Sequence, residues 1–130
     1  MSVDIPNFPT WLTDSNACTA AVTWVNGVDF TTAWTTCSRP DWMLWLLHQA
    51  MIQGLTGFPA TRADIVSIAT TAINLSTSSY KAELLAQVTF YSVQSDPKFI
   101  PMSLNDDMYD AGAFGDMTSV ANSVRSAVTV

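Results

Sequence analysis

The fold of this chain is decided by the stretch Asp41-Trp42-Met43-Leu44-Trp45-Leu46-Leu47, which directly follows Pro40. Proline suits the first turn of a helix, because the N–H that it lacks would have no intrahelical partner there. The spacing predicts one helix over about residues 40–53, with apolar side chains on nearly every side. Such a helix must be covered by the rest of a small domain or by a partner.

Capping residues and apolar periodicity predict further helices on both sides of this one, over about residues 16–26, 30–37, 62–75 and 80–94, with a final helix near the C-terminus. Asp14 or Ser15, Asp29 and Thr61 are the expected N-caps. Residues 1–13 are expected to form an extended N-terminal arm, and residues 95–104 an irregular connection. The sequence therefore predicts one all-α domain over residues 1–130, a bundle of about five helices.

The composition limits the classes of function. Of the 130 residues, 48% are apolar and only 12% are charged, which excludes a disordered chain. The formal net charge of −6 repels a phosphate backbone, so no direct nucleic-acid binding is expected; a basic protein surface is the alternative partner. We find no signal-peptide pattern, and the longest apolar stretch is too short for a bilayer, so no membrane association is expected.

Candidate catalytic groups are few. His48 is the only histidine, and a structural role is favoured over a hydrolytic one. Cys18 and Cys37 fit neither a redox motif nor a zinc site; we expect them to be reduced and buried, with a disulfide as the alternative. No phosphate-binding loop or zinc-helix motif is present. The sequence therefore predicts no catalytic residue, no metal ligand and no cofactor, and a protein that is not an enzyme.

Aspartates and aromatic residues are the remaining candidates. Three aspartates at 106, 107 and 110, together with Asp116, precede the predicted final helix, where capping is favoured over cation binding. Tryptophans 24, 34, 42 and 45 are expected in the core, whereas Phe114 and other aromatics near proline or glycine are expected to be exposed. The residues expected to contact a partner are Trp11, Phe58, Phe99, Asp106, Asp107 and Asp110.

One region resembles a known group of proteins. Cys18, Ala21 and Trp24, followed by the run from Ala33-Trp34 through Cys37 to Arg39-Pro40-Asp41-Trp42-Met43-Leu44-Trp45-Leu46, are similar to a motif of small bacterial and phage proteins. That family is largely uncharacterised, and some members are described as immunity proteins. Its usual glycine is replaced by Pro40 here. The resemblance covers about residues 17–75 and implies a helical fold and a phage or bacterial source, without catalytic residues.

Three functions are compatible with these observations. The favoured one is a protein-binding accessory factor, acting by occupying a partner's surface, with inhibition of a host defence system as one version. The alternative is a self-associating structural protein of a virion or shell, and the remote one a small hydrolytic enzyme using His48. The expected location is the cytoplasm of a bacterial host cell or the virion, and a homo-oligomer is compatible with either of the first two.

Overall fold

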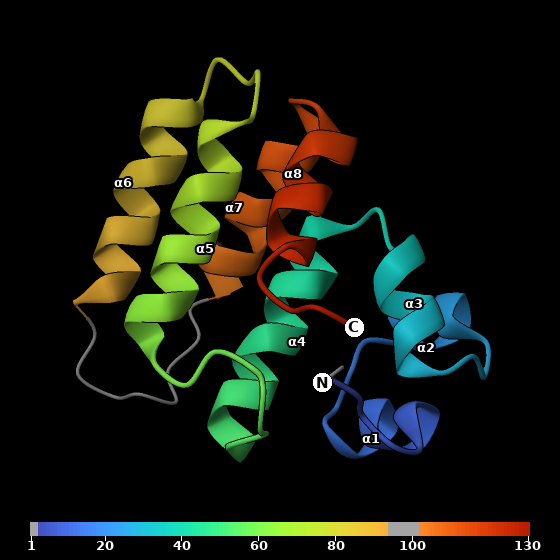
Figure 1. Ribbon diagram of the computed structural model, residues 1–130. Coiled ribbons are helices and arrows are strands. Elements are labelled where there is room, and N and C mark those ends of the chain that lie inside the picture. Colours follow the sequence, from blue (N-terminus) through green and yellow to red (C-terminus); the bar gives the residue numbers. More distant parts are fainter. Residues whose placement is uncertain (1–2, 94–101) are drawn as a thin grey trace.

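The computed structural model describes residues 3–93 and 102–130, where all regular secondary structure is helical (Figure 1). Eight helices lie in these ranges: α1 Phe8–Asp14, α2 Thr19–Val25, α3 Phe30–Thr36, α4 Pro40–Gln53, α5 Arg62–Asn74, α6 Lys81–Ser92, α7 Met102–Ala113 and α8 Met117–Arg125. The predicted all-α class is therefore confirmed. The predicted number of about five helices is wrong, because α1 lies in the predicted N-terminal arm and two helices, α7 and α8, stand where one final helix was expected.

Helices α4 to α8 form the bundle that holds the main core. Neighbouring helices in it are α4 and α7, α5 and α6, α5 and α8, and α6 and α7, and Figure 1 shows α5 and α6 side by side at one edge. Its fully buried side chains are mostly aliphatic and include Leu44, Leu47, Ile65, Ile73, Val88, Met108, Val120 and Val124. The other helices of the bundle cover one apolar face of α4, as the sequence of α4 requires.

The three short helices α1 to α3 lie together beside α4, at the side of the bundle opposite α6 (Figure 1). Aromatic rings hold them there: Phe30 contacts Phe8 with ring centroids 5.4 Å apart and Phe58 at 5.7 Å, both edge to face. At the end of α4, the Trp11 indole donates a hydrogen bond of 2.8 Å to the side chain of Gln53. The N-terminal helices are thus attached largely through aromatic packing.

A second attachment joins α3 to the C-terminal segment. The Arg125 guanidinium donates hydrogen bonds to the backbone carbonyls of Trp34 and Cys37, the latter at 2.8 Å. The Trp34 indole donates in turn to the carbonyl of Val128, at 3.2 Å. These bonds satisfy carbonyls at the end of α3 that have no intrahelical partner, so α8 serves as the C-terminal cap of α3.

Several predicted helix ends are confirmed. Pro40 lies in the first turn of α4 and Gly54 ends that helix with a φ of 68°, which glycine adopts readily. Asp29 and Thr61 cap α3 and α5 by accepting hydrogen bonds from the backbone N–H groups of Thr32 and Asp64.

Three predicted boundaries are wrong. Residues 1–13 are not an extended arm, since α1 occupies residues 8–14 and buries Phe8 and Leu12. Helix α2 begins only at Thr19, because Asn16 adopts a φ of 63° that interrupts the predicted helix over 16–26. Residues 102–104 of the predicted connection belong to α7, while the rest of that connection lies outside the described residues. Within the described ranges, no helix combines the length and the apolar character that crossing a bilayer requires.

Candidate functional site

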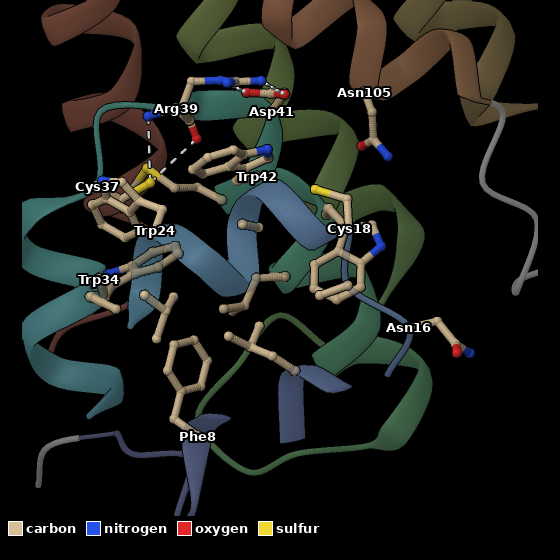
Figure 2. Close-up of a pocket in the computed structure, with 18 residues that line it drawn as sticks. Phe8, Asn16, Cys18, Trp24, Trp34, Cys37, Arg39, Asp41, Trp42 and Asn105 are labelled. Atoms are coloured by element: carbon tan, nitrogen blue, oxygen red, sulfur yellow. Dashed lines mark hydrogen bonds and ion pairs between the residues drawn. The ribbon is translucent and has the colours of Figure 1, made fainter. Parts of the chain in front are cut away.

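A pocket of about 420 Å³ lies between the N-terminal helices and α4 (Figure 2). Its deepest walls are buried side chains of α3 and α4, namely Ala33, Trp34, Met43 and Leu46. The volume falls in the range of ligand-binding pockets, which are lined mostly by apolar and aromatic side chains. The pocket is the strongest candidate for a functional site among the residues that the structure describes.

The sequence of α4 builds one side of this pocket. Because α4 is apolar nearly all round, it supplies core residues to the bundle and still has Trp42 and Trp45, one turn apart, for the opposite side. Both indoles are half-buried and pack against the core from outside. The second apolar face of α4 is therefore not fully covered by the protein's own helices.

Helix α2 covers the pocket only thinly. Of its seven residues, Val25 alone is buried, and the Trp24 side chain remains 41% exposed. The Trp24 ring packs against that of Trp42, with centroids 6.0 Å apart and planes at 54°. Ala21 and Cys18 also line the pocket, and their small side chains leave space beneath the helix. The cover over the pocket is thus a two-turn helix of small residues with one large indole.

One end of the pocket is polar and carries a fixed ion pair. Arg39 binds Asp41 through two hydrogen bonds of 2.9 and 2.8 Å, drawn in Figure 2. Its guanidinium carbon also lies 4.3 Å from the centre of the Trp42 ring and 4.9 Å from that of Tyr109. The hydrogen bonds to Asp41 raise the pKa of Arg39. This cation is therefore held by a carboxylate and two aromatic faces and stabilises the wall of the pocket.

Both cysteines line the pocket and are free thiols. Cys37 is buried as predicted; its sulfur accepts a hydrogen bond from the Arg39 N–H at 3.4 Å, and burial raises its pKa. Cys18 is exposed, so the prediction that it is buried is wrong; it is the N-cap residue that precedes α2, and its side chain remains accessible to solvent. In the described part of the chain, no three metal-ligating side chains lie together.

The aromatic residues expected at a partner surface are distributed differently from the prediction. Phe58 is buried against Phe30 and is not exposed, because the loop after α4 folds back over the N-terminal helices. Trp11 is half-buried, and its ring faces Trp45 edge to face at 6.2 Å behind the pocket. Phe99 lies outside the described residues. Phe114 is exposed as expected.

The predicted aspartates are brought together, but not as helix caps. Asp106, Asp107 and Asp110 all lie within α7, so the prediction that they cap the start of the final helix is wrong. Asp106 is exposed, Asp110 half-buried and Asp107 buried. Asp116 does cap α8, accepting a hydrogen bond of 3.2 Å from the Ser119 N–H. Of the residues of α7, Asn105 lines the pocket, whereas the three aspartates of this helix do not.

His48 lies away from this pocket, in the core of the bundle. It is 1% exposed and shares a hydrogen bond of 2.7 Å with the Tyr91 hydroxyl through its Nδ1 atom. The Arg62 guanidinium lies 5.0 Å from the centre of the Tyr91 ring. Burial raises the pKa of Tyr91, and the nearby Arg62 opposes this. The histidine therefore belongs to a buried polar cluster that joins α4 to α6.

Sequence analysis missed two features of the site. Trp24 was expected in the core and is instead partly exposed, because the residues that α2 turns inward are small and Val25 is its one buried side chain. Asn105 was not predicted to contribute to a site, because it directly follows the predicted irregular connection over residues 95–104. The sequence feature that could have indicated the incomplete cover is the shortness of the 16–26 segment, which Asn16 and Gly27 delimit. A helix of two turns cannot cover the second face of α4 completely.

Comparison with known proteins adds no name to this geometry. No protein-family model, curated protein or solved structure matches the chain.

Proposed function

We propose that this protein is a non-catalytic accessory factor, of phage or bacterial origin, that acts by occupying the surface of a partner protein. The observation that carries the proposal is the apolar pocket under α2, with Trp24 exposed and Trp42 and Trp45 half-buried around it. The resemblance of residues 17–75 to small bacterial and phage proteins supports the proposed source.

The chemistry of the pocket favours recognition. Tryptophan is enriched among residues that dominate binding energy, since its ring buries a large area with few rotatable bonds. The 41% exposure of Trp24 means that a partner can still remove much of this ring from water. Few charged side chains line the pocket, so little water bound to charged groups must be removed when a partner binds.

The acidity of the chain favours a basic partner. A net charge of −6 steers the protein towards positively charged surfaces and slows its approach to acidic ones. The nucleic-acid-binding site of a host defence enzyme is one surface of this kind, and inhibition of such an enzyme is the specific version of the proposal. The protein would then act in the cytoplasm of the bacterial host cell.

The test is affinity capture from a bacterial host lysate with Trp24→Ser as the diagnostic variant. We expect a specific partner with the unaltered chain and at least a tenfold loss with Trp24→Ser, equivalent to about 1.4 kcal/mol. Phe114→Ser is the matched control, because Phe114 is 61% exposed but lies on the turn between α7 and α8. Capture that is unaffected by Trp24→Ser, or lost equally with Phe114→Ser, would contradict the proposal.

Self-association as a virion or shell protein is the second candidate, and a different surface favours it. The rings of Tyr80 and Phe114 pack edge to face at 6.3 Å, yet their side chains are 55% and 61% exposed, and Leu75 is 49% exposed. Light scattering of the purified chain separates the candidates. A concentration-dependent oligomer that Phe114→Ser disperses and Trp24→Ser leaves intact would favour the structural role.

A further inference from the structure

We infer that the pocket under α2 binds a small, uncharged aromatic molecule. The inference goes beyond the proposed function, because it concerns the interior of the pocket, whereas the proposed partner covers the exposed Trp24 at its edge. It follows from four properties of the lining residues: the volume that they enclose, their aromatic character, their balanced charge and the state of their polar groups.

The pocket is an enclosed volume beneath a helix. It measures about 420 Å³ and lies between α2 and the buried side chains of α3 and α4 (Figure 2). Pockets that bind small molecules measure about 300–1,000 Å³, so this one lies near the lower end of that range. A helix of a partner is about 10–12 Å wide with its side chains and does not fit in such a space. The volume therefore suits a small molecule of one or two rings.

Aromatic side chains form most of the walls. The rings that line the pocket come from α1 to α4 and are Phe8, Trp24, Trp34, Trp42 and Trp45. Aromatic rings prefer offset-stacked or edge-to-face contacts with other rings, and such contacts stabilise a complex beyond the area that they bury. A flat aromatic ligand can make these contacts, whereas a saturated ligand of the same size gains only from burial. The walls therefore favour an aromatic ligand.

The lining carries no net charge. Arg39 and Asp41 are the charged residues among those that line the pocket, and two hydrogen bonds of 2.9 and 2.8 Å join them. The guanidinium also lies over the ring of Trp42, at 4.3 Å from its centre. A charged ligand would lose its hydration on entry without finding a free countercharge in the lining. The balanced ion pair therefore favours an uncharged ligand.

The polar groups of the inner wall already have hydrogen-bond partners. The Trp34 indole N–H donates to the Val128 carbonyl at 3.2 Å, and the Cys37 sulfur accepts from the Arg39 N–H at 3.4 Å. An apolar ring against this wall therefore leaves no polar group newly unsatisfied. At the α7 side, the Asn105 amide can donate to a ligand hydroxyl or accept from it (Figure 2). An aromatic ring with one hydroxyl matches this distribution of polar groups.

The probe is β-naphthol, which is uncharged at neutral pH, titrated into the isotope-labelled full chain. We expect saturable shifts of the indole N–H resonances of Trp24, Trp42 and Trp45, with a dissociation constant between about 10 μM and 1 mM. Nuclear Overhauser effects between the naphthol ring and the methyl groups of Met43 and Leu46 should place the ligand in the pocket, because both residues line it.

Analogues of the same size test the selectivity. β-Naphthoate and β-naphthylmethylammonium carry charges of opposite sign on the same ring system, and each should bind at least about tenfold more weakly. β-Decalol has the same carbon skeleton without aromatic rings and should bind about threefold to tenfold more weakly. Equal affinity for either charged analogue, or for β-decalol, would overturn the inference, because the lining would then not select an uncharged aromatic molecule.

A pair of variants tests the location. Ala21→Phe fills the space under α2 and should abolish binding, whereas Ala86→Phe, at an exposed position of α6, should leave the affinity unchanged. If Ala21→Phe does not fold, the Overhauser effects in the unaltered chain decide. Effects confined to methyl groups of α5 to α8, without Met43 or Leu46, would overturn the inference. So would the absence of any saturable shift at concentrations up to about 2 mM.

Failure of this inference is distinguishable from failure of the proposed function. Binding of β-naphthol is judged with the purified chain and Ala21→Phe, whereas capture of a partner is judged with Trp24→Ser. A chain that binds no β-naphthol but captures a partner through Trp24 would overturn the inference alone. A chain that binds β-naphthol in the pocket and captures no partner would overturn the proposed function alone.

Discussion

Asp107 is a buried carboxyl in a part of the molecule that the sequence marks as a polar surface. It is 3% exposed on α7, and the Gln87 amide of α6 faces it, with the nitrogen 2.8 and 3.1 Å from the carboxyl oxygens when it acts as donor. Burial, with smaller effects of Asp110 and Asp106, raises the pKa of Asp107 to about 7. In the opposite orientation the Gln87 amide oxygen faces Asp107 and can accept a hydrogen bond from the protonated carboxyl. Both the ionised and the protonated form of Asp107 therefore keep a hydrogen bond.

This carboxyl predicts an unusual dependence of stability on pH. In the unfolded chain its pKa is about 3.9, so between about pH 4 and 7 the folded state binds more protons. Stability should therefore fall as the pH rises through this window and level off above it. In urea unfolding, Asp107→Asn should flatten the profile and stabilise the protein at pH 8 by about 1–2 kcal/mol.

The matched control for this prediction is Asp106→Asn, an exposed residue of the same type one position away. It should retain most of the pH dependence, since Asp107 remains buried. A profile that is the same for the unaltered chain and Asp107→Asn would show that this carboxyl does not control the dependence.

At the scale of single elements, α2 buries the fewest side chains of the helices that the structure describes. It has seven residues, buries only Val25 and has no side-chain N-cap at Cys18. Residues with positive φ flank it, namely Asn16 at 63° and Asn26 at 49°. Isolated helices of this length are unstable in water, so α2 depends on a small number of apolar contacts across the pocket.

Hydrogen–deuterium exchange should detect this difference. The amides of α2 are expected to exchange on the order of 100-fold faster than the central amides of α5, whose Ile65, Ala69 and Ile73 are fully buried. Protection of α2 equal to that of α5 in the free protein would contradict the prediction.

The elements also show how far the sequence predicts this fold. Helix α4 matches the prediction at both ends because Pro40 and Gly54 act locally on the backbone. Helix α7 was predicted poorly because Gly112 lowers the local helix propensity. The glycine suits the tertiary packing, since a Cβ at this position would lie 2.8 Å from the Pro40 side chain. Close approach between segments distant in sequence cannot be read from propensity.

The candidate site was predicted less well than the fold, for a related reason. The composition of α4 shows that two apolar faces must be covered, but not how completely α2 covers one of them. Phe58 and Trp24 illustrate this, since the loop phenylalanine is buried and the helical tryptophan is partly exposed. Exposure depends on the lengths of the covering elements and on how they fold back, which periodicity does not encode.

At the scale of the whole molecule, the two thiols lie at different depths of one pocket. Cys18 is exposed, whereas Cys37 is 5% exposed at the end of α3, where Arg125 of α8 binds its carbonyl. Burial raises the pKa of Cys37, which further lowers its reactivity because the thiolate is the nucleophile. Access of a bulky reagent to Cys37 therefore requires the helices around the pocket to move apart.

A thiol-reactive dye should report this separation. In the native protein we expect rapid labelling of Cys18 alone, with Cys37 labelled only at the rate of unfolding or of local opening of α3. Cys18→Ser should remove the fast phase and Cys37→Ser the slow one. Arg125→Ala should accelerate the slow phase by leaving two carbonyls without their donor. Equal labelling rates for both cysteines would rule out this arrangement.

The aromatic chromophores divide between the two halves of the molecule. All five tryptophans lie between residues 11 and 45, in α1 to α4, and all three tyrosines lie between residues 80 and 109. Intrinsic emission excited selectively from indole therefore reports on the N-terminal helices and the pocket, whereas tyrosine absorbance reports on α6 and α7. Melting curves recorded in the two optical channels would separate if the small aromatic half detaches before the bundle unfolds.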